Sequence, residues 1–107
     1  LPDLNLGTNG GVTCDARVER AVAGLAAAPP FTFVANGRFR GGWTTRHYGR
    51  PAEGWHAIQM EIAQRAYLAA EAPPWTYDPA RAAVLRGRLA SILTTLADLA
   101  PTLGGTQ

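Results

Sequence analysis

The stretch that decides the fold is residues 3–36, DLNLGTNGGVTCDARVERAVAGLAAAPPFTFVAN. Residues 3–7 alternate polar and apolar side chains, which is typical of a short strand. Residues 31–36, FTFVAN, are aromatic and β-branched with a polar residue at the end, which is typical of a buried strand. Between them lie a glycine-rich turn at residues 7–11 and a longer segment that Pro29-Pro30 ends.

That longer segment has the periodicity of a helix. Val18, Val22 and Leu25 recur at helical spacing, and Thr13 or Asp15 can cap the helix start. A strand, a helix of about fifteen residues and a second strand predict a βαβ unit with a right-handed crossover. The fold class predicted from the sequence is therefore α/β.

Ligands of open α/β sheets collect beyond the carboxyl ends of the strands. Here those ends are Thr8-Asn9 and Asn36-Gly37-Arg38. The sequence therefore predicts, in outline, a binding site near these two segments.

Residues 37–54 are typical of a long loop. Residues 43–48, WTTRHY, interrupt it, and their β-forming side chains predict a short strand or hairpin arm. No acidic residue occurs between Gly37 and Pro51, whereas four arginines do, which predicts a site for an anion such as a carboxylate or a phosphate. The four are Arg38, Arg40, Arg46 and Arg50.

Residues 55–68 fit two periodicities. As a helix, Ile58 and Ile62 share a face; as a strand, Met60 and Ile62 face one way and Glu61 the other. We favour a strand over residues 55–64, from which Glu61 projects.

A final helix is predicted to begin at Asp78-Pro79, a capping residue followed by proline. Arg81, Arg86 and Arg88 are expected to lie mostly on its solvent side, and residues 101–107 are expected to form a flexible tail. Apolar residues that step by four and three positions predict its core-facing seam: Leu85, Leu89, Ile92, Leu96 and Leu99.

The chain has 107 residues, enough for one domain, and a net charge of +2. No apolar run approaches the roughly 18 residues of a membrane span, so no membrane partner is expected. The single cysteine, Cys14, excludes an internal disulfide and favours a reducing, cytoplasmic location. Two histidines without a CxxC motif make no complete metal site of a common type.

Glu61 is the first candidate for chemistry. A carboxylate between apolar neighbours is costly unless a cation, hydrogen bonds or a raised pKa compensates. One interpretation is a general base that activates water. The alternative is a solvated glutamate on a helix, or an ion-pair partner of Arg65 or Arg46.

The next candidates lie in the TTRHYG segment. Strand alternation would place Arg46 and Tyr48 on one face, where both could bind a carboxylate, and His47 on the other. A buried Arg–Glu pair and a packed tyrosine are the structural alternative. His47 and His56 lack metal-ligand spacing, so each is a proton donor, a single metal ligand or a hydrogen-bonded structural residue. Cys14 is interpreted as a small buried hydrophobe.

Arg38 and Arg40 with Phe39 and Trp43 could also form a nucleic-acid surface. The small charge excess, the absence of lysine and the lack of a binding signature argue against it. No nucleic-acid partner is therefore expected.

Three stretches together resemble one family: residues 3–15 (DLNLGTNGGVTCD), 36–51 (NGRFRGGWTTRHYGRP) and 56–68 (HAIQMEIAQRAYL). They are similar to the carboxyl-terminal part of the N-formylglutamate deformylase, or N-formylglutamate amidohydrolase, family of bacterial histidine degradation. The resemblance implies a zinc-peptidase-like, three-layer α/β/α hydrolase fold with a mixed sheet and flanking helices. It also implies release of formate and L-glutamate from N-formyl-L-glutamate.

The resemblance further implies site residues. Glu61 matches the family's acidic residue on a late strand and would be the general base that deprotonates metal-bound water. Arg46 would bind the glutamate carboxylates, and Tyr48 or His47 would orient the substrate or stabilise the oxyanion. Further substrate-binding candidates are Arg38, Asn36 and Gln59.

The implied cofactor is a divalent metal, zinc, bound mainly by residues outside this chain, so no metal ligand is expected within residues 1–107. The chain is then an incomplete C-terminal fragment, inactive alone and able to self-associate through a sheet edge and apolar surface. The alternative is a stand-alone α/β module that binds an anion or a partner without catalysis.

Overall fold

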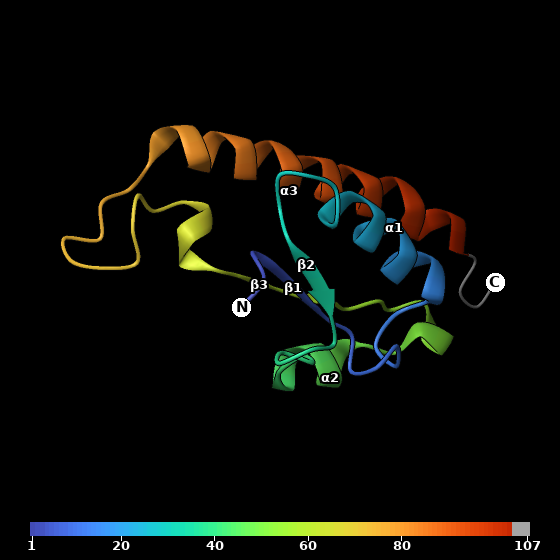
Figure 1. Ribbon diagram of the computed structural model, residues 1–107. Helices are drawn as coiled ribbons and strands as arrows, with labels where there is room; N and C mark the ends of the chain where they lie inside the picture. Colours follow the sequence, from blue (N-terminus) through green and yellow to red (C-terminus); the bar gives the residue numbers. More distant parts are fainter. Residues whose placement is uncertain (104–107) are drawn as a thin grey trace.

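A computed structural model describes residues 1–103 (Figure 1). The strands are β1 (Leu4–Gly7), β2 (Phe33–Ala35) and β3 (Gln59–Ile62). The helices are α1 (Ala16–Ala26), α2 (Trp43–Tyr48) and α3 (Pro79–Leu99). Short 3₁₀ turns occur at Pro51–Glu53, Gln64–Ala66 and Ala100–Leu103.

The sheet has the order β2-β1-β3, with β1 in the centre. β1 pairs in parallel with β2, so that Leu4 lies opposite Phe33. It pairs antiparallel with β3, so that Asn5 lies opposite Glu61. The parallel pair with α1 between its strands confirms the predicted βαβ unit and the α/β class, and the sheet is mixed.

The first helix follows its sequence signals. Asp15 caps α1 and accepts a hydrogen bond from the backbone N–H of Arg17. Val18, Val22 and Ala26, spaced by four residues, are its buried face. The alternative cap, Thr13, instead donates its hydroxyl to the carbonyl of Ala57 at 2.7 Å.

The core lies between the sheet and the helix pair α1 and α3, which lie together on one side of the sheet in Figure 1. Leu4 and Leu6 of β1 point into this core and are fully buried, which contributes about 1.5–3 kcal/mol each. Met60 and Ile62 of β3 pack against the same core. Because side chains alternate along a strand, Glu61 points to the opposite face.

The last helix has the predicted start and seam. Asp78 caps α3 by accepting from the N–H groups of Ala80 and Arg81. Leu85 and Ile92 are buried, and further seam residues are packed beside them. The tail prediction falls partly on residues 104–107, which lie outside the described residues; residues 100–103 continue α3 as a 3₁₀ turn.

Arg88 was expected on the solvent side of α3, but its side chain instead binds the chain at the end of α1. Its Nη1 donates to the carbonyls of Leu25 at 2.7 Å and Ala28 at 2.8 Å, and its Nη2 donates to Pro29 at 2.9 Å. Its guanidinium lies 5.1 Å from the ring centroid of Phe31. The reason is that α1 ends at Ala26, so the carbonyls at and just after its end lack the N–H donors of a further helical turn.

The strand or hairpin arm predicted over residues 43–48 is wrong, because this segment is the helix α2. Its backbone bonds run from Arg46 N to Gly42 O at 3.1 Å and from Gly49 N to Thr45 O at 3.0 Å. The expected strand alternation of residues 46–48 is therefore wrong as well. The strand predicted over residues 55–64 is confirmed only in its second half, as β3.

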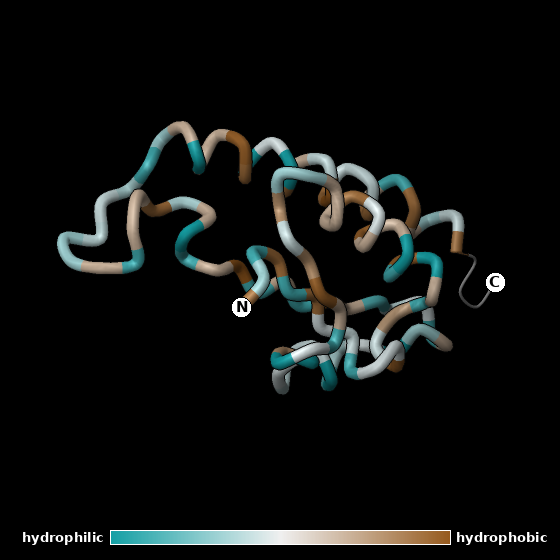
Figure 2. The backbone as a smooth tube through the Cα atoms, viewed as in Figure 1, coloured by the Kyte–Doolittle hydropathy of each residue, from teal (hydrophilic) through white to brown (hydrophobic). Residues whose placement is uncertain are grey.

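The molecule is elongated, with extents of 50 × 25 × 18 Å. Figure 2 shows a mostly pale or hydrophilic backbone where the connection before α3 extends away from the sheet. Within residues 1–103, no helix has the length and apolar character needed to span a membrane.

Candidate functional site

The turn after β1 is held by its own backbone. The carbonyl of Thr8 accepts hydrogen bonds from the N–H groups of Gly11, Val12 and Thr13 at 2.9–3.1 Å. The turn passes through positive φ at Gly10, where φ is +69°. The predicted glycine-rich turn at residues 7–11 is therefore part of a closed, hydrogen-bonded loop.

Asn36, at the end of β2, joins the carboxyl ends of the two parallel strands. Its Oδ1 accepts from the N–H groups of Thr8 at 2.9 Å and Gly10 at 3.0 Å, and its Nδ2 donates to the Thr8 hydroxyl at 2.9 Å. The Thr8 hydroxyl in turn donates to the carboxylate of Glu19 on α1. Three of the four bonds that the Asn36 amide can form are therefore made within the loop.

Residues 40–42 lie directly against the end of β1. The N–H of Asn9 donates to the carbonyl of Arg40 at 2.6 Å. A Cβ placed on Gly7 would lie 2.5 Å from the backbone nitrogen of Gly41, so only glycine fits there. The side chain of Arg40 lies over Gly10. Arg40 was predicted as one of four loop arginines that could bind an anion, but not as a residue of the catalytic site.

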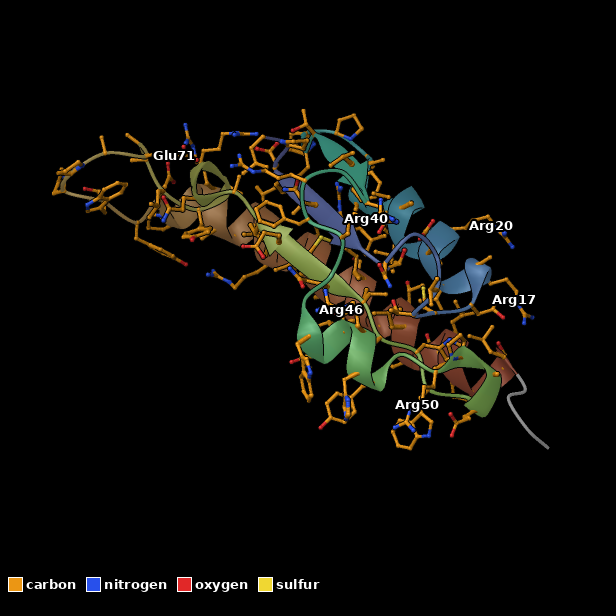
Figure 3. The ribbon with its side chains drawn as sticks, turned by 90° about the horizontal axis from the view of Figure 1, so that it is seen from below. Arg17, Arg20, Arg40, Arg46, Arg50 and Glu71 are labelled. Atoms are coloured by element: carbon orange, nitrogen blue, oxygen red, sulfur yellow. The ribbon has the colours of Figure 1, made fainter. Side chains whose placement is uncertain are left out.

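Glu61 lies on the face of the sheet opposite the helix pair, and its carboxylate accepts one hydrogen bond from the described residues. Nε2 of Gln59 donates to Oε2 of Glu61 at 3.2 Å, and Oε1 of Gln59 accepts from the N–H of Gly42 at 2.6 Å. Nη1 of Arg46 donates to the carbonyl of Gly41 at 3.1 Å. Arg46 and Gln59 thus bind the neighbouring residues Gly41 and Gly42, and Glu61 is joined to them through Gln59. Figure 3 shows Arg46 on α2, near β3.

Glu61 takes part in none of the salt bridges formed by the described part of the chain. Arg65, one partner considered for it, instead pairs with Asp3, with Nε and Oδ1 2.8 Å apart. Arg46 bonds to a backbone carbonyl. Glu61 is half-buried on a strand, so neither a helix position nor an ion pair with Arg65 or Arg46 accounts for it.

Asn5 is a buried polar residue that the sequence analysis missed. It is 1% exposed, lies opposite Glu61 on β1, and donates from Nδ2 to the carbonyls of Pro2 and Glu61. Its Oδ1 has no hydrogen-bond partner among residues 1–103. The signal that could have identified Asn5 is its position as a polar residue within the alternating strand pattern DLNLG.

His47 and Tyr48 lie in an exposed aromatic cluster on α2. The rings of Trp43 and His47 stack with centroids 4.3 Å apart, and Tyr48 packs edge-on against both. None of the described contacts joins this cluster to Glu61. Arg38 is exposed and forms no hydrogen bond or ion pair with another described residue.

His56 and Cys14 have the structural roles that the sequence analysis considered. Nδ1 of His56 accepts from the N–H of Asp15 at 3.0 Å. Cys14 is buried, and burial together with the negative charge of Glu19 raises the pKa of its thiol to about 11. The thiol is therefore neutral and unreactive at pH 7.

Two cavities lie away from Glu61. One of about 310 Å³ is lined by Asp3, Phe31, Arg65, Arg81 and their neighbours at the opposite end of β1. The other, of about 250 Å³, is an apolar groove between β3 and α3. Glu61 lines neither of them.

The described residues do not fit a metal ion. No group of three or more histidine, cysteine, aspartate or glutamate side chains within residues 1–103 is arranged to hold one. The carbonyl oxygen of Asn5 and the carboxylate of Glu61 lie on neighbouring strands, but two oxygen-bearing side chains are too few for a protein zinc site.

Comparison with known proteins gives consistent matches. Residues 1–68 match the family described as N-formylglutamate amidohydrolase. N-formylglutamate deformylase of Pseudomonas aeruginosa is 50% identical over 97 residues, which are 87% of this chain and 36% of that protein. N-formylglutamate deformylase of Pseudomonas putida is 49% identical over 78 residues, which are 72% of this chain and 29% of that protein.

The fold also matches a solved structure. The crystal structure of N-formylglutamate amidohydrolase from Ralstonia eutropha JMP134 has a TM-score of 0.75 and 26% sequence identity. The match covers 96% of this chain and 35% of that chain. The chain thus spans about a third of the length of the relatives that it matches.

Proposed function

The chain belongs to the N-formylglutamate amidohydrolase family, and from this premise we propose that it is the C-terminal portion of a hydrolase. The reaction is hydrolysis of N-formyl-L-glutamate to formate and L-glutamate, in cytoplasmic histidine degradation. We extend the proposal to the zinc-peptidase-like, three-layer fold, in which the missing layer covers the open face of the sheet. The half-buried Glu61 carboxylate, which has no ion-pair partner in residues 1–103, is the observation that carries the proposal.

Glu61 is the general base of the proposed reaction. Gln59 binds its Oε2, while Oε1 has no hydrogen-bond partner among the described residues and can accept a proton from water. The water oxygen then forms a bond to the formyl carbon. The proton passes from Glu61 to the amide nitrogen as the C–N bond breaks, which releases formate and L-glutamate with a free amino group.

Arg46 is the main group proposed to bind the substrate carboxylates. One terminal nitrogen donates to Gly41, which leaves the other terminal nitrogen and Nε for a carboxylate. Asn36 retains one Nδ2 hydrogen, and Arg38 supplies a second exposed guanidinium. His47 and Tyr48 would contact the substrate from the exposed face of α2.

A divalent metal, zinc, is part of the proposal as a group bound mainly by residues outside this chain. Residues 1–103 supply no ligand set for it, so the steps above are assigned only to this chain's own side chains. Metal analysis of the purified gene product that contains residues 1–107 tests this part separately.

The test of the reaction is Glu61→Gln in that full gene product. Loss of the base is expected to lower kcat by about 10²- to 10⁴-fold, with little change in KM or in the melting temperature. Glu53→Gln is the matched control, because Glu53 is exposed and, among residues 1–103, forms an ion pair with Arg50 alone, at 3.8 Å. Turnover of Glu61→Gln near that of the wild type would refute the assignment.

The exposed arginines and aromatic rings of residues 38–50 support a second candidate, a module that binds an anion or a partner without catalysis. It predicts that the full gene product binds a dicarboxylate through Arg46 but releases no formate from N-formyl-L-glutamate. Formate release that depends on Glu61 excludes it.

A further inference from the structure

The side-chain amide of Gln59 is hydrogen bonded at both ends within the chain. Its Oε1 accepts from the backbone N–H of Gly42 at 2.6 Å, and its Nε2 donates to Oε2 of Glu61 at 3.2 Å. Gln59 and Glu61 are two residues apart on β3 and therefore project from the same face of the strand. Gly42 lies at the start of α2, 17 residues away in the sequence.

Chemistry fixes the direction in which this amide points. A backbone N–H can only donate, so the end of the amide that faces Gly42 must be the oxygen. The NH₂ end must then face Glu61, whose carboxylate accepts. The flipped amide would set a donor against a donor and an oxygen against a carboxylate, and both contacts would be repulsive.

We infer that Gln59 is a positioning residue, which holds the Glu61 carboxylate in one orientation and links it to the loop that carries Arg46. This inference rests on the proposed role of Glu61 as the base. It goes beyond the predicted substrate contact of Gln59, because Oε1 and Nε2 of its amide each already form one hydrogen bond within the chain.

The link joins the two halves of the proposed site. Arg46 is bonded to the carbonyl of Gly41, and Gln59 is bonded to the N–H of Gly42, so both side chains hold the same two-residue segment. That segment is in turn fixed against Gly7 of β1. The proposed substrate-binding arginine and the proposed base are therefore both linked to one backbone segment, and Oε1 of Glu61 has no hydrogen-bond partner among residues 1–103.

Two variants separate the two ends of the amide. Gln59→Leu removes both hydrogen bonds. Gln59→Glu keeps an acceptor for Gly42 but places a second carboxylate beside Glu61, which disfavours the ionised base. Gln64→Leu and Gln64→Glu are matched controls, because Gln64 is exposed and follows the same strand.

In the full gene product, Gln59→Leu is expected to lower kcat about 10- to 100-fold at nearly constant KM. Gln59→Glu is expected to move the acidic limb of the kcat profile about one pH unit or more to higher pH. The ¹³C titration of the Glu61 carboxyl carbon in the same variants should move in the same direction, and this readout does not depend on turnover. The Gln64 variants should change none of these quantities.

Three results would overturn the inference: an unchanged acidic limb and ¹³C titration in Gln59→Glu, unchanged kcat in a folded Gln59→Leu, or a raised KM at constant kcat, which indicates substrate contact. If Gln59→Leu does not fold, the Gln59→Glu measurements decide.

Glu61→Gln separates the two proposals. If Glu61→Gln is inactive while the Gln59 variants behave as wild type, only the positioning role fails. If Glu61→Gln stays active, the proposed base fails as well.

Discussion

Asp3 shows how a single carboxylate secures the start of β1. Its Oδ2 accepts from the N–H of Thr32 at 2.9 Å and from the Thr32 hydroxyl at 3.1 Å, and its Oδ1 pairs with Arg65. Burial acts to raise the pKa of Asp3, but the Thr32 hydrogen bonds and the charge of Arg65 hold it below its usual value of 3.8. The folded state therefore prefers the ionised carboxylate.

Because the pKa of Asp3 is lower in the folded than in the unfolded protein, its contribution to stability is present above about pH 4 and is lost as the pH falls through the folded pKa. Asp3→Asn is expected to lower the free energy of unfolding by about 1–2 kcal/mol at pH 7. The difference should fade below about pH 4. Urea unfolding at several pH values measures it.

The control for this prediction is Asp98→Asn, since Asp98 is exposed on α3 and lies outside the ion pairs of the described residues. It should change stability little at any pH. A loss in Asp3→Asn that is equal at pH 3 and pH 7 would mean that packing, and not charge, explains the effect.

At this scale the sequence was informative where the signal is local. A cap at Thr13 or Asp15 could be predicted because both residues precede the helix, and the structure has Asp15 as the cap. The alternating pattern likewise predicted that Glu61 projects from a strand, where the structure has it. The bonds of Gln59 could not be predicted, because they depend on Gly42, which only the folded chain brings near. The same holds for Asn5, whose burial results from strands on both of its sides.

Among the elements, α2 departs most from expectation. Its tryptophan, threonines and tyrosine favour strands, and that local preference was overridden by tertiary contacts. Thr45 is the buried residue of the helix and packs against Gly41, while the helix start is bonded to β3 through Gln59. Such contacts cannot be inferred from six residues of sequence.

The contact between β1 and the loop at 40–42 predicts the cost of adding one methyl group. In Gly7→Ala the new Cβ would lie 2.5 Å from the nitrogen of Gly41 and 2.7 Å from the carbonyl carbon of Arg40, and backbone atoms cannot move aside cheaply. We expect a loss of about 1–3 kcal/mol in the free energy of unfolding.

Gly87→Ala is the matched control. Gly87 lies in the interior of α3, and apart from its chain neighbours and the adjacent helix backbone no described atom lies within 4 Å of a Cβ placed on it. Alanine is the better helix former there, so a gain of about 0.5–1 kcal/mol is expected. Thermal unfolding of both variants checks the pair, and equal stability in the two would contradict the close seating of the loop on β1.

For the whole molecule, the sheet leaves an edge at β3 and an apolar groove beside it. The groove lies between β3 and α3, and Leu93 on its rim is 66% exposed. The βαβ half was predictable because its periodicities are clear. The placement of β3 was less certain, because residues 55–68 fit both a helix and a strand; the strand was favoured from the residues and then by the family resemblance.

Residues 1–107 produced alone are therefore expected to self-associate through this groove and edge. Sedimentation velocity over a range of concentrations should show a rising mean mass. Leu93→Glu should reduce the association, because it places a charge on the apolar rim. Thr94→Glu adds the same charge to the neighbouring exposed position outside the groove and should not. A mass that stays monomeric for the wild type at every concentration would exclude the prediction.

The bonds of Arg88 have a consequence for the order in which the protein can fold as it is made. The carbonyl of Ala28 accepts a hydrogen bond from Arg88, which is 60 residues further along the chain. Within residues 1–107, β1, α1 and β2 are synthesised before α3, so the carbonyls of Leu25, Ala28 and Pro29 lack the Arg88 donor until α3 follows. The contacts between the βαβ unit and α3 can therefore form only after residues 37–78 have been synthesised.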